Sequence, residues 1–266
     1  MRPPRRAVGK PLHPNVGIGE TYRQRLERLV DEMNASLLYW LVARWREAPP
    51  TAAIIAHDES WMGALQRTMR ELERRWQKKF DEAAPDLAKA FADGVARRTT
   101  ANIQRVLQDG GMPVVDFRMS QATRAVVQAA VAENTTLIKS IAQEHLQDVS
   151  GVVMRSVSTG RDLETMSTEL QARFDVPKKR AELIARHQNN AATAAITRSR
   201  MQEAGISRAI WKHSHGGREP RPEHQRWDGQ EFNPATGMWS EVDGEWVWPG
   251  TPINCRCYSR PVISGF

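Results

Sequence analysis

Apolar side chains recur every three to four residues along most of the chain, the spacing that places them on one face of an α-helix. The pattern predicts a first helix over residues 20–48, which two consecutive prolines end because proline lacks an amide proton and clashes with the preceding turn. A second helix is expected over 58–84. Pro85 either kinks this helix or restarts a third segment, which runs over 85–108.

The helical pattern continues in the middle of the chain. Its longest stretch covers residues 120–157, and the apolar stripe there is typical of a core or a helix–helix interface. A short helix is expected next, with apolar residues spaced by three, four and four at Leu163, Met166, Leu170 and Phe174. Pro177 suits the first turn of a further helix. Gly205 followed by Ile206 predicts that this helix ends in a left-handed cap with an apolar contact behind it.

The composition changes near residue 206. Residues 206–266 hold five of the nine tryptophans and seven of the seventeen glycines in short segments. Asp243-Gly244 between two strand-like runs indicates a β-hairpin. We therefore predict a mainly α fold, with an elongated helical body over 20–205 and a compact, loop-rich α+β domain over 206–266.

The positive charge is concentrated outside this C-terminal region. The formal net charge is +7, and residues 206–266 contribute none of it. Residues 1–19 contain four prolines, three glycines and no acidic residue, which predicts a flexible basic arm. Such an arm suits DNA, because neutralising phosphates releases condensed counterions. The candidate DNA-binding residues are Arg2, Arg5, Arg6 and Lys10, although a solvated leader without a ligand explains the same composition.

Several classes of protein are disfavoured by the sequence. Two cysteines cannot form a disulfide framework. No apolar run approaches the roughly 20 residues that a membrane-spanning helix needs, so no membrane partner is expected. The basic N-terminus lacks the apolar stretch of a secretory signal, and we expect synthesis in the cytoplasm. Phosphate-binding loops, dinucleotide-binding glycine patterns and the G-x-S-x-G motif are all missing from the sequence.

Cys255 and Cys257 are the strongest candidates for metal ligands. In an extended segment both sulfurs would project from the same face. His224, with His215 as a further candidate, could complete a tetrahedral site for zinc, which favours thiolate and imidazole ligands. The C-x-C spacing is rarer in zinc sites than C-x-x-C. Two buried thiols with His224 in a local hydrogen-bond network are therefore the competing interpretation.

An enzymatic site is the alternative for the same region. His215, Glu219, His224 and Asp228 lie close in sequence, and a metal-dependent nuclease or hydrolase would use histidine with acidic residues. The zinc deaminase pattern fails, because it requires H-x-E and P-C-x-x-C. Since no complete catalytic set is evident, the sequence predicts a protein that is not an enzyme.

The order of motifs over about 160–263 carries a resemblance to a known family. The motifs are Arg180 to Arg186, Glu203-Ala204-Gly205-Ile206, Trp211, Arg221-Pro222-x-His224, Asp228-Gly229, Pro249-Gly250 and Asn254-Cys255-Arg256-Cys257. This region resembles the phage Mu F-like head morphogenesis (minor capsid) protein family. The chain departs from the family at His213-Ser214-His215, where relatives commonly carry an aspartate, and His215 could replace it.

The resemblance implies a virion protein of a tailed bacteriophage, made in the host cytoplasm and located inside the head. It implies association with the portal protein and with major capsid or scaffold proteins during assembly. Double-stranded DNA would be bound weakly and without sequence specificity. Zinc is the one cofactor under consideration, and oligomerisation through the long helices stays open.

Overall fold

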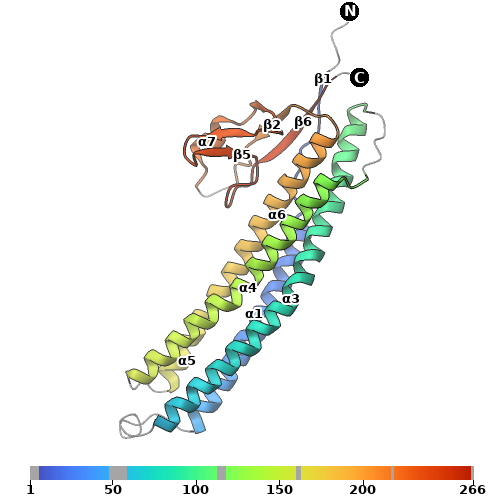
Figure 1. Ribbon diagram of the computed structural model, residues 1–266. Coiled ribbons are helices and arrows are strands. Elements are labelled where there is room, and N and C mark those ends of the chain that lie inside the picture. Colours follow the sequence, from blue (N-terminus) through green and yellow to red (C-terminus); the bar gives the residue numbers. More distant parts are fainter. Residues whose placement is uncertain (1–5, 48–58, 113–117, 160–162, 217–218, 265–266) are drawn as a thin grey trace, which may run out of the picture. The chain divides into compact units, whose positions relative to one another are not determined.

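A computed structural model describes residues 6–47, 59–112, 118–159, 163–216 and 219–264 (Figure 1). Long α-helices dominate the chain, and a small region of short antiparallel strands lies toward the C-terminus. The predicted fold class, mainly α with a small C-terminal α+β region, is confirmed. None of the helices in the described ranges combines the length and apolar character that crossing a bilayer requires.

Five helices of the described residues lie close to their predicted positions. They are α1 (Val16–Glu47), α3 (Glu59–Asp109), α4 (Gln121–Ser158), α5 (Leu163–Arg173) and α6 (Asp175–Glu203). The main difference is α3, which runs without interruption through Pro85. Proline removes one backbone hydrogen bond there. The neighbouring side chains of Phe80, Ala84 and Ala88 are fully buried, and this packing outweighs the lost bond.

The chain divides into two compact units whose boundaries cross the long helices. One unit contains residues 22–88 and 133–184, and the other contains 1–21, 89–132 and 185–266. The predicted domain boundary near residue 206 stays a prediction. Both the strands and the candidate metal ligands fall in the second unit.

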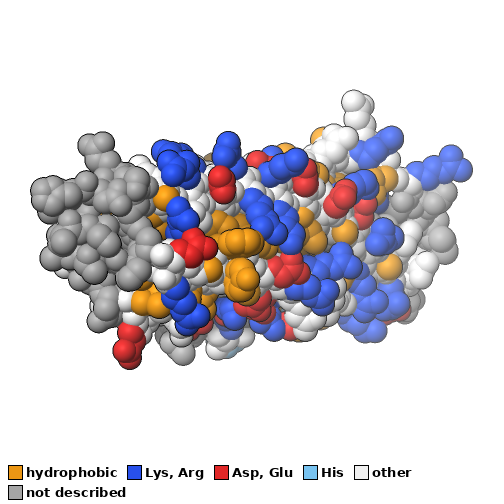
Figure 2. All heavy atoms as spheres, turned by 90° about the horizontal axis from the view of Figure 1, so that it is seen from below, with side chains coloured by type: hydrophobic (Ala, Val, Ile, Leu, Met, Phe, Trp, Pro, Cys, Tyr) orange, Lys and Arg blue, Asp and Glu red, His pale blue; other side chains and the backbone are white. Residues whose placement is uncertain are grey.

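The helical unit over 22–88 and 133–184 has an apolar core and charged outer faces. Its fully buried side chains include those of Leu26, Met33, Trp45, Phe80, Ile138 and Ile141. On the surface Lys79 pairs with Glu32 at 2.5 Å, and Lys178 pairs with Asp31 at 2.7 Å. Figure 2 shows basic and acidic side chains interleaved around a hydrophobic strip on the face that it displays. This mixing is expected of solvated helix surfaces.

The other unit is built around an antiparallel sheet with the strand order β1-β6-β2-β3. These strands are β1 (Arg6–Val8), β6 (Tyr258–Ser264), β2 (Ala209–Lys212) and β3 (Glu231–Phe232). A separate hairpin joins β4 (Met238–Ser240) to β5 (Glu245–Val247), and α7 (Pro222–Arg226) lies between β2 and β3 in sequence. Trp211 on β2 is fully buried in a cluster that also contains Ile103 of α3 and Met201 of α6.

The N-terminal segment differs from the flexible arm expected over residues 1–19. Arg6–Val8 forms β1 and pairs with β6, and the Gly9 N–H donates to the Pro261 carbonyl at 2.8 Å. Leu12 is buried in the same cluster as Trp211. Proline and glycine suggested disorder here, but strand pairing and one buried leucine fix the described part of the segment.

Two local predictions are confirmed. Gly205 has a φ of +69°, and the amides of Gly205 and Ile206 donate to the carbonyls of Gln202 and Met201, which is the Schellman pattern of a helix end. Ile206 is buried behind the cap. The β4–β5 hairpin forms around Gly244, whose φ is +68°.

Candidate metal-binding site

The ends of β2 and β6 position the first side chains of the site. Lys212, the last residue of β2, pairs with Tyr258, the first residue of β6. His213 follows β2 directly and Cys257 precedes β6 directly, so both lie at the same end of this strand pair. Their side chains are buried, with exposed fractions of 6% and 5%.

Helix α7 brings His224 to the same place. Pro222 occupies the first turn of this short helix, where its missing amide proton costs nothing. The buried carboxylate of Glu223 accepts hydrogen bonds from the Ser240 hydroxyl at 2.7 Å and from the Glu241 amide at 3.0 Å. These bonds connect α7 to the β4–β5 hairpin.

The His224 ring is held by two tryptophans. It stacks on Trp227 with ring centroids 5.3 Å apart, and it meets Trp211 in a T-shaped contact at 5.0 Å. The imidazole therefore has one packed orientation. Two of the five tryptophans of this region thus position the histidine.

The loop that carries Cys255 and Cys257 is attached to α6. Gly250 has a φ of +91°, and a Cβ at this position would lie 3.2 Å from the Cys257 carbonyl and 3.3 Å from the Cβ of Ala194. The Asn190 side chain donates to the Cys255 carbonyl at 2.9 Å. The glycine of the Pro-Gly motif is thus explained by a close approach of the loop to the helix.

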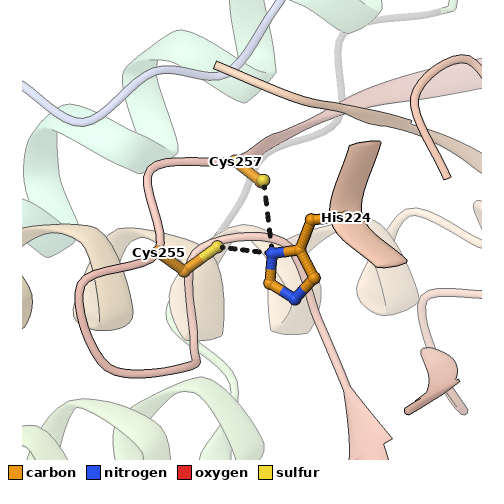
Figure 3. A group of neighbouring side chains, drawn as sticks. All are labelled: His224, Cys255 and Cys257. Carbon is orange, nitrogen blue, oxygen red and sulfur yellow. Dashed lines mark hydrogen bonds between the residues drawn. The ribbon is translucent and has the colours of Figure 1, made fainter. Parts of the chain in front are cut away.

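The three predicted ligands Cys255, Cys257 and His224 come together. The Nδ1 atom of His224 lies 3.5 Å from the sulfur of Cys255 and 3.6 Å from that of Cys257 (Figure 3). All three ligand atoms lie within 4.8 Å of one another, and all three residues are buried. Figure 3 shows the two sulfurs pointing from the loop toward the imidazole on α7.

His215, the other ligand candidate, lies outside this cluster. Its φ of +54° turns the chain, and its side chain is 71% exposed with Nε2 3.7 Å from the Asp228 carboxylate. Asp228 also pairs with Lys212 at 2.6 Å and accepts the His213 amide at 2.9 Å. His215 and Asp228 thus stabilise the turn that follows β2.

The two thiols form an electrostatically coupled pair. A hydrogen bond from the Cys257 thiol holds the pKa of Cys255 well below its usual range, against burial and with further help from His224. The same hydrogen bond, together with burial, raises the pKa of Cys257. One proton shared between two close sulfurs is the expected result, because two adjacent thiolates would repel each other.

Sequence reasoning missed His213. Its Nδ1 accepts the His215 amide at 3.2 Å, and it lines a small pocket together with Glu219, His224 and both cysteines. Burial alternates from Trp211 through Lys212 to His213, so the period of two in β2 was the available signal. Among the described residues this pocket has a volume of about 40 Å³, which holds a water molecule and is well below the volume of usual ligand pockets.

The candidate DNA-binding residues of the N-terminus are only partly described. Arg2 and Arg5 lie outside the described residues, and Arg6 is described only as part of the β1 backbone. Lys10 is exposed and pairs with Asp109 of α3 at 2.8 Å. Its charge is therefore partly compensated within the protein.

Comparison with known proteins supports the family resemblance that the sequence motifs carry. Residues 147–260 match the family described as Phage Mu protein F like protein. The match includes α7, the three clustered ligands and most of the strands. The family resemblance predicted from the sequence is thus confirmed over this region.

The chain is also similar to an uncharacterized protein of Haemophilus influenzae. The two are 28% identical over 246 residues, which is 91% of this chain and 52% of the relative. The chain therefore spans about half the length of this relative. No solved structure matches the chain.

Proposed function

We propose that this protein is a minor head protein of a tailed bacteriophage, which acts inside the head at the portal and next to the packaged DNA. The match of residues 147–260 to the Mu F-like family carries this proposal. The motif residues of that match from Arg186 onward fall within one compact unit. Arg221 donates to the carbonyl of Ile253 at 3.1 Å, and Asn190 donates to that of Cys255 at 2.9 Å.

A structural role is supported by the size of the pocket. The clustered histidines, cysteines and Glu219 surround about 40 Å³, whereas ligand pockets usually enclose several hundred cubic ångströms. Asp228, one of the acids of the alternative nuclease site, is engaged by Lys212 and by the His213 amide. A metal-dependent hydrolase at this place is therefore the less favoured function.

The β4–β5 hairpin offers a surface for the portal protein. Trp239 and Trp246 are cross-strand neighbours with ring centroids 5.7 Å apart, and they are 44% and 52% exposed. Val242 at the tip is 77% exposed. Exposed tryptophans are typical of the central residues of protein interfaces. We refer to Trp239, Trp246 and Val242 as the hairpin surface.

The test is co-purification of the full chain with the portal protein of the same genome. We expect a complex by native mass spectrometry, and we expect the double variant Trp239→Ser/Trp246→Ser to weaken it at least tenfold without lowering the Tm. Trp248→Ser is the contrasting variant. The Trp248 indole donates to the Pro234 carbonyl at 3.0 Å and stacks under Arg198, so this change should lower the Tm.

Two results would contradict the proposal. The first is a portal protein that does not bind the wild-type chain under conditions where both are folded. The second is cleavage of DNA by the purified chain with divalent metals, provided that His224→Gln abolishes the cleavage. That outcome would favour the hydrolase.

A further inference from the structure

We propose that His224, Cys255 and Cys257 bind one Zn²⁺ ion, which fastens the cysteine loop to α7, and that a water molecule from the adjoining pocket takes the fourth coordination position. This site is independent of the portal-associated role. Among the described residues, these three side chains form the only group of three or more that could bind a metal ion.

The spacing of the three atoms fits a zinc tetrahedron. Zinc binds thiolate at about 2.3 Å and imidazole at about 2.0–2.1 Å, so a tetrahedral angle separates a nitrogen and a sulfur ligand by roughly 3.6 Å. The observed separations of His224 Nδ1 from the two sulfurs are 3.5 and 3.6 Å. An ion can therefore enter with little movement of these side chains.

The surroundings also suit a thiolate-bound metal. All three ligand residues are buried, so the protein around them would limit access of solvent to the ion. The His224 ring is fixed by Trp211 and Trp227, so the metal would meet an imidazole that is already in place.

The fourth position faces the pocket. Its volume of about 40 Å³ exceeds the roughly 10–15 Å³ that one water molecule requires. His213 also lines this pocket, but it is not part of the group whose ligand atoms lie within 4.8 Å of one another. We assign the fourth ligand to water, which His213 and Glu219 at the wall of the pocket would hold by hydrogen bonds.

The experiment measures metal in the full-length chain purified from zinc-supplemented medium and dialysed without chelator. We expect one zinc per chain by elemental analysis. Replacement by Co²⁺ should give the charge-transfer absorption of a thiolate ligand. Removal of the metal should lower the Tm by roughly 5–10 °C, because a ligand that binds only the folded state stabilises it.

The variants separate ligands from neighbours. Cys255→Ser, Cys257→Ser and His224→Gln should each reduce bound zinc to a small fraction, whereas the matched control His215→Gln should retain one zinc per chain. Any variant that fails to fold is set aside, because the wild-type zinc content and Co²⁺ spectrum decide by themselves. Wild-type protein with much less than one zinc and no thiolate absorption would overturn the proposal, as would loss of zinc in His215→Gln.

Discussion

His145 on α4 is buried and is not part of the candidate metal site. Burial lowers its pKa to about 4, although the nearby charge of Asp148 opposes the shift. Between pH 6.5 and pH 4 the unfolded chain therefore binds a proton that the folded chain rejects. The neutral imidazole favours folding above pH 6.5, and this advantage is lost as the pH falls toward 4.

We predict that His145 lowers the free energy of unfolding by up to about 3 kcal/mol when the pH falls from 7 to 4. The free energy of unfolding, measured with urea at both pH values, should fall less in His145→Leu than in the wild type. Comparing the two proteins removes the contribution of carboxylates, which both share. An identical pH dependence in the two proteins would show that His145 is not the cause.

Gly250 is a residue where the backbone of the site is tightly constrained. An alanine there would combine a φ of +91° with a Cβ 3.2 Å from the Cys257 carbonyl. We expect Gly250→Ala to lower the free energy of unfolding by about 2–3 kcal/mol. Gly244→Ala is the control, because Gly244 also has positive φ but a Cβ there meets no atom within 4 Å. Equal losses in the two variants would contradict the importance of the close approach.

The candidate site was partly predictable from single residues. The C-x-C spacing and His224 indicated the three ligands, because few residue types bind zinc and they cluster in one region of the sequence. The exclusion of His215 and the burial of His213 depend on the turn after β2 and on the pairing of Lys212 with Tyr258. This pairing joins residues 46 positions apart in the sequence, so it could not be predicted from a local sequence pattern.

At the scale of elements, α3 continues through Pro85, although a proline inside a helix usually kinks or ends it. Packing of the neighbouring buried side chains keeps the helix continuous. Pro85 is exposed and lies well inside the helix, where an alanine would restore a hydrogen bond to the carbonyl four residues earlier. We predict that Pro85→Ala raises the free energy of unfolding by about 1–2 kcal/mol, because part of the gain is offset by a more flexible unfolded chain. Thermal unfolding followed by circular dichroism would measure it. A lower Tm would mean that the helix needs its proline geometry.

The helices and the hairpin were predictable because their signals are local. Apolar periodicity located the long helices to within a few residues, and Gly205 and Gly244 marked a helix end and a turn. The strand β1 was not predictable, since three residues next to prolines become a strand only by pairing with β6 at the other end of the chain. Its formation is a tertiary effect.

At the scale of the whole molecule, the charge distribution leads to a prediction about DNA. Arg2, Arg5 and Arg6 are the basic residues of the N-terminal segment other than Lys10, which pairs with Asp109. Replacing all three arginines by glutamine should reduce the slope of log Kobs against log salt by about 2–3 units. Substitution is preferable to deleting residues 1–19, because the deletion would also remove Leu12, which is part of the hydrophobic core. An unchanged slope would show that these three arginines do not contact DNA phosphates.

The central claim is that this protein is a component of phage heads. Quantitative mass spectrometry of purified, DNA-filled heads assembled from the genome that encodes it tests this claim most directly. We predict that peptides of this chain are present at a few copies per portal ring, and that deleting its gene impairs head production. Filled heads of normal yield from which the chain is missing would contradict the account.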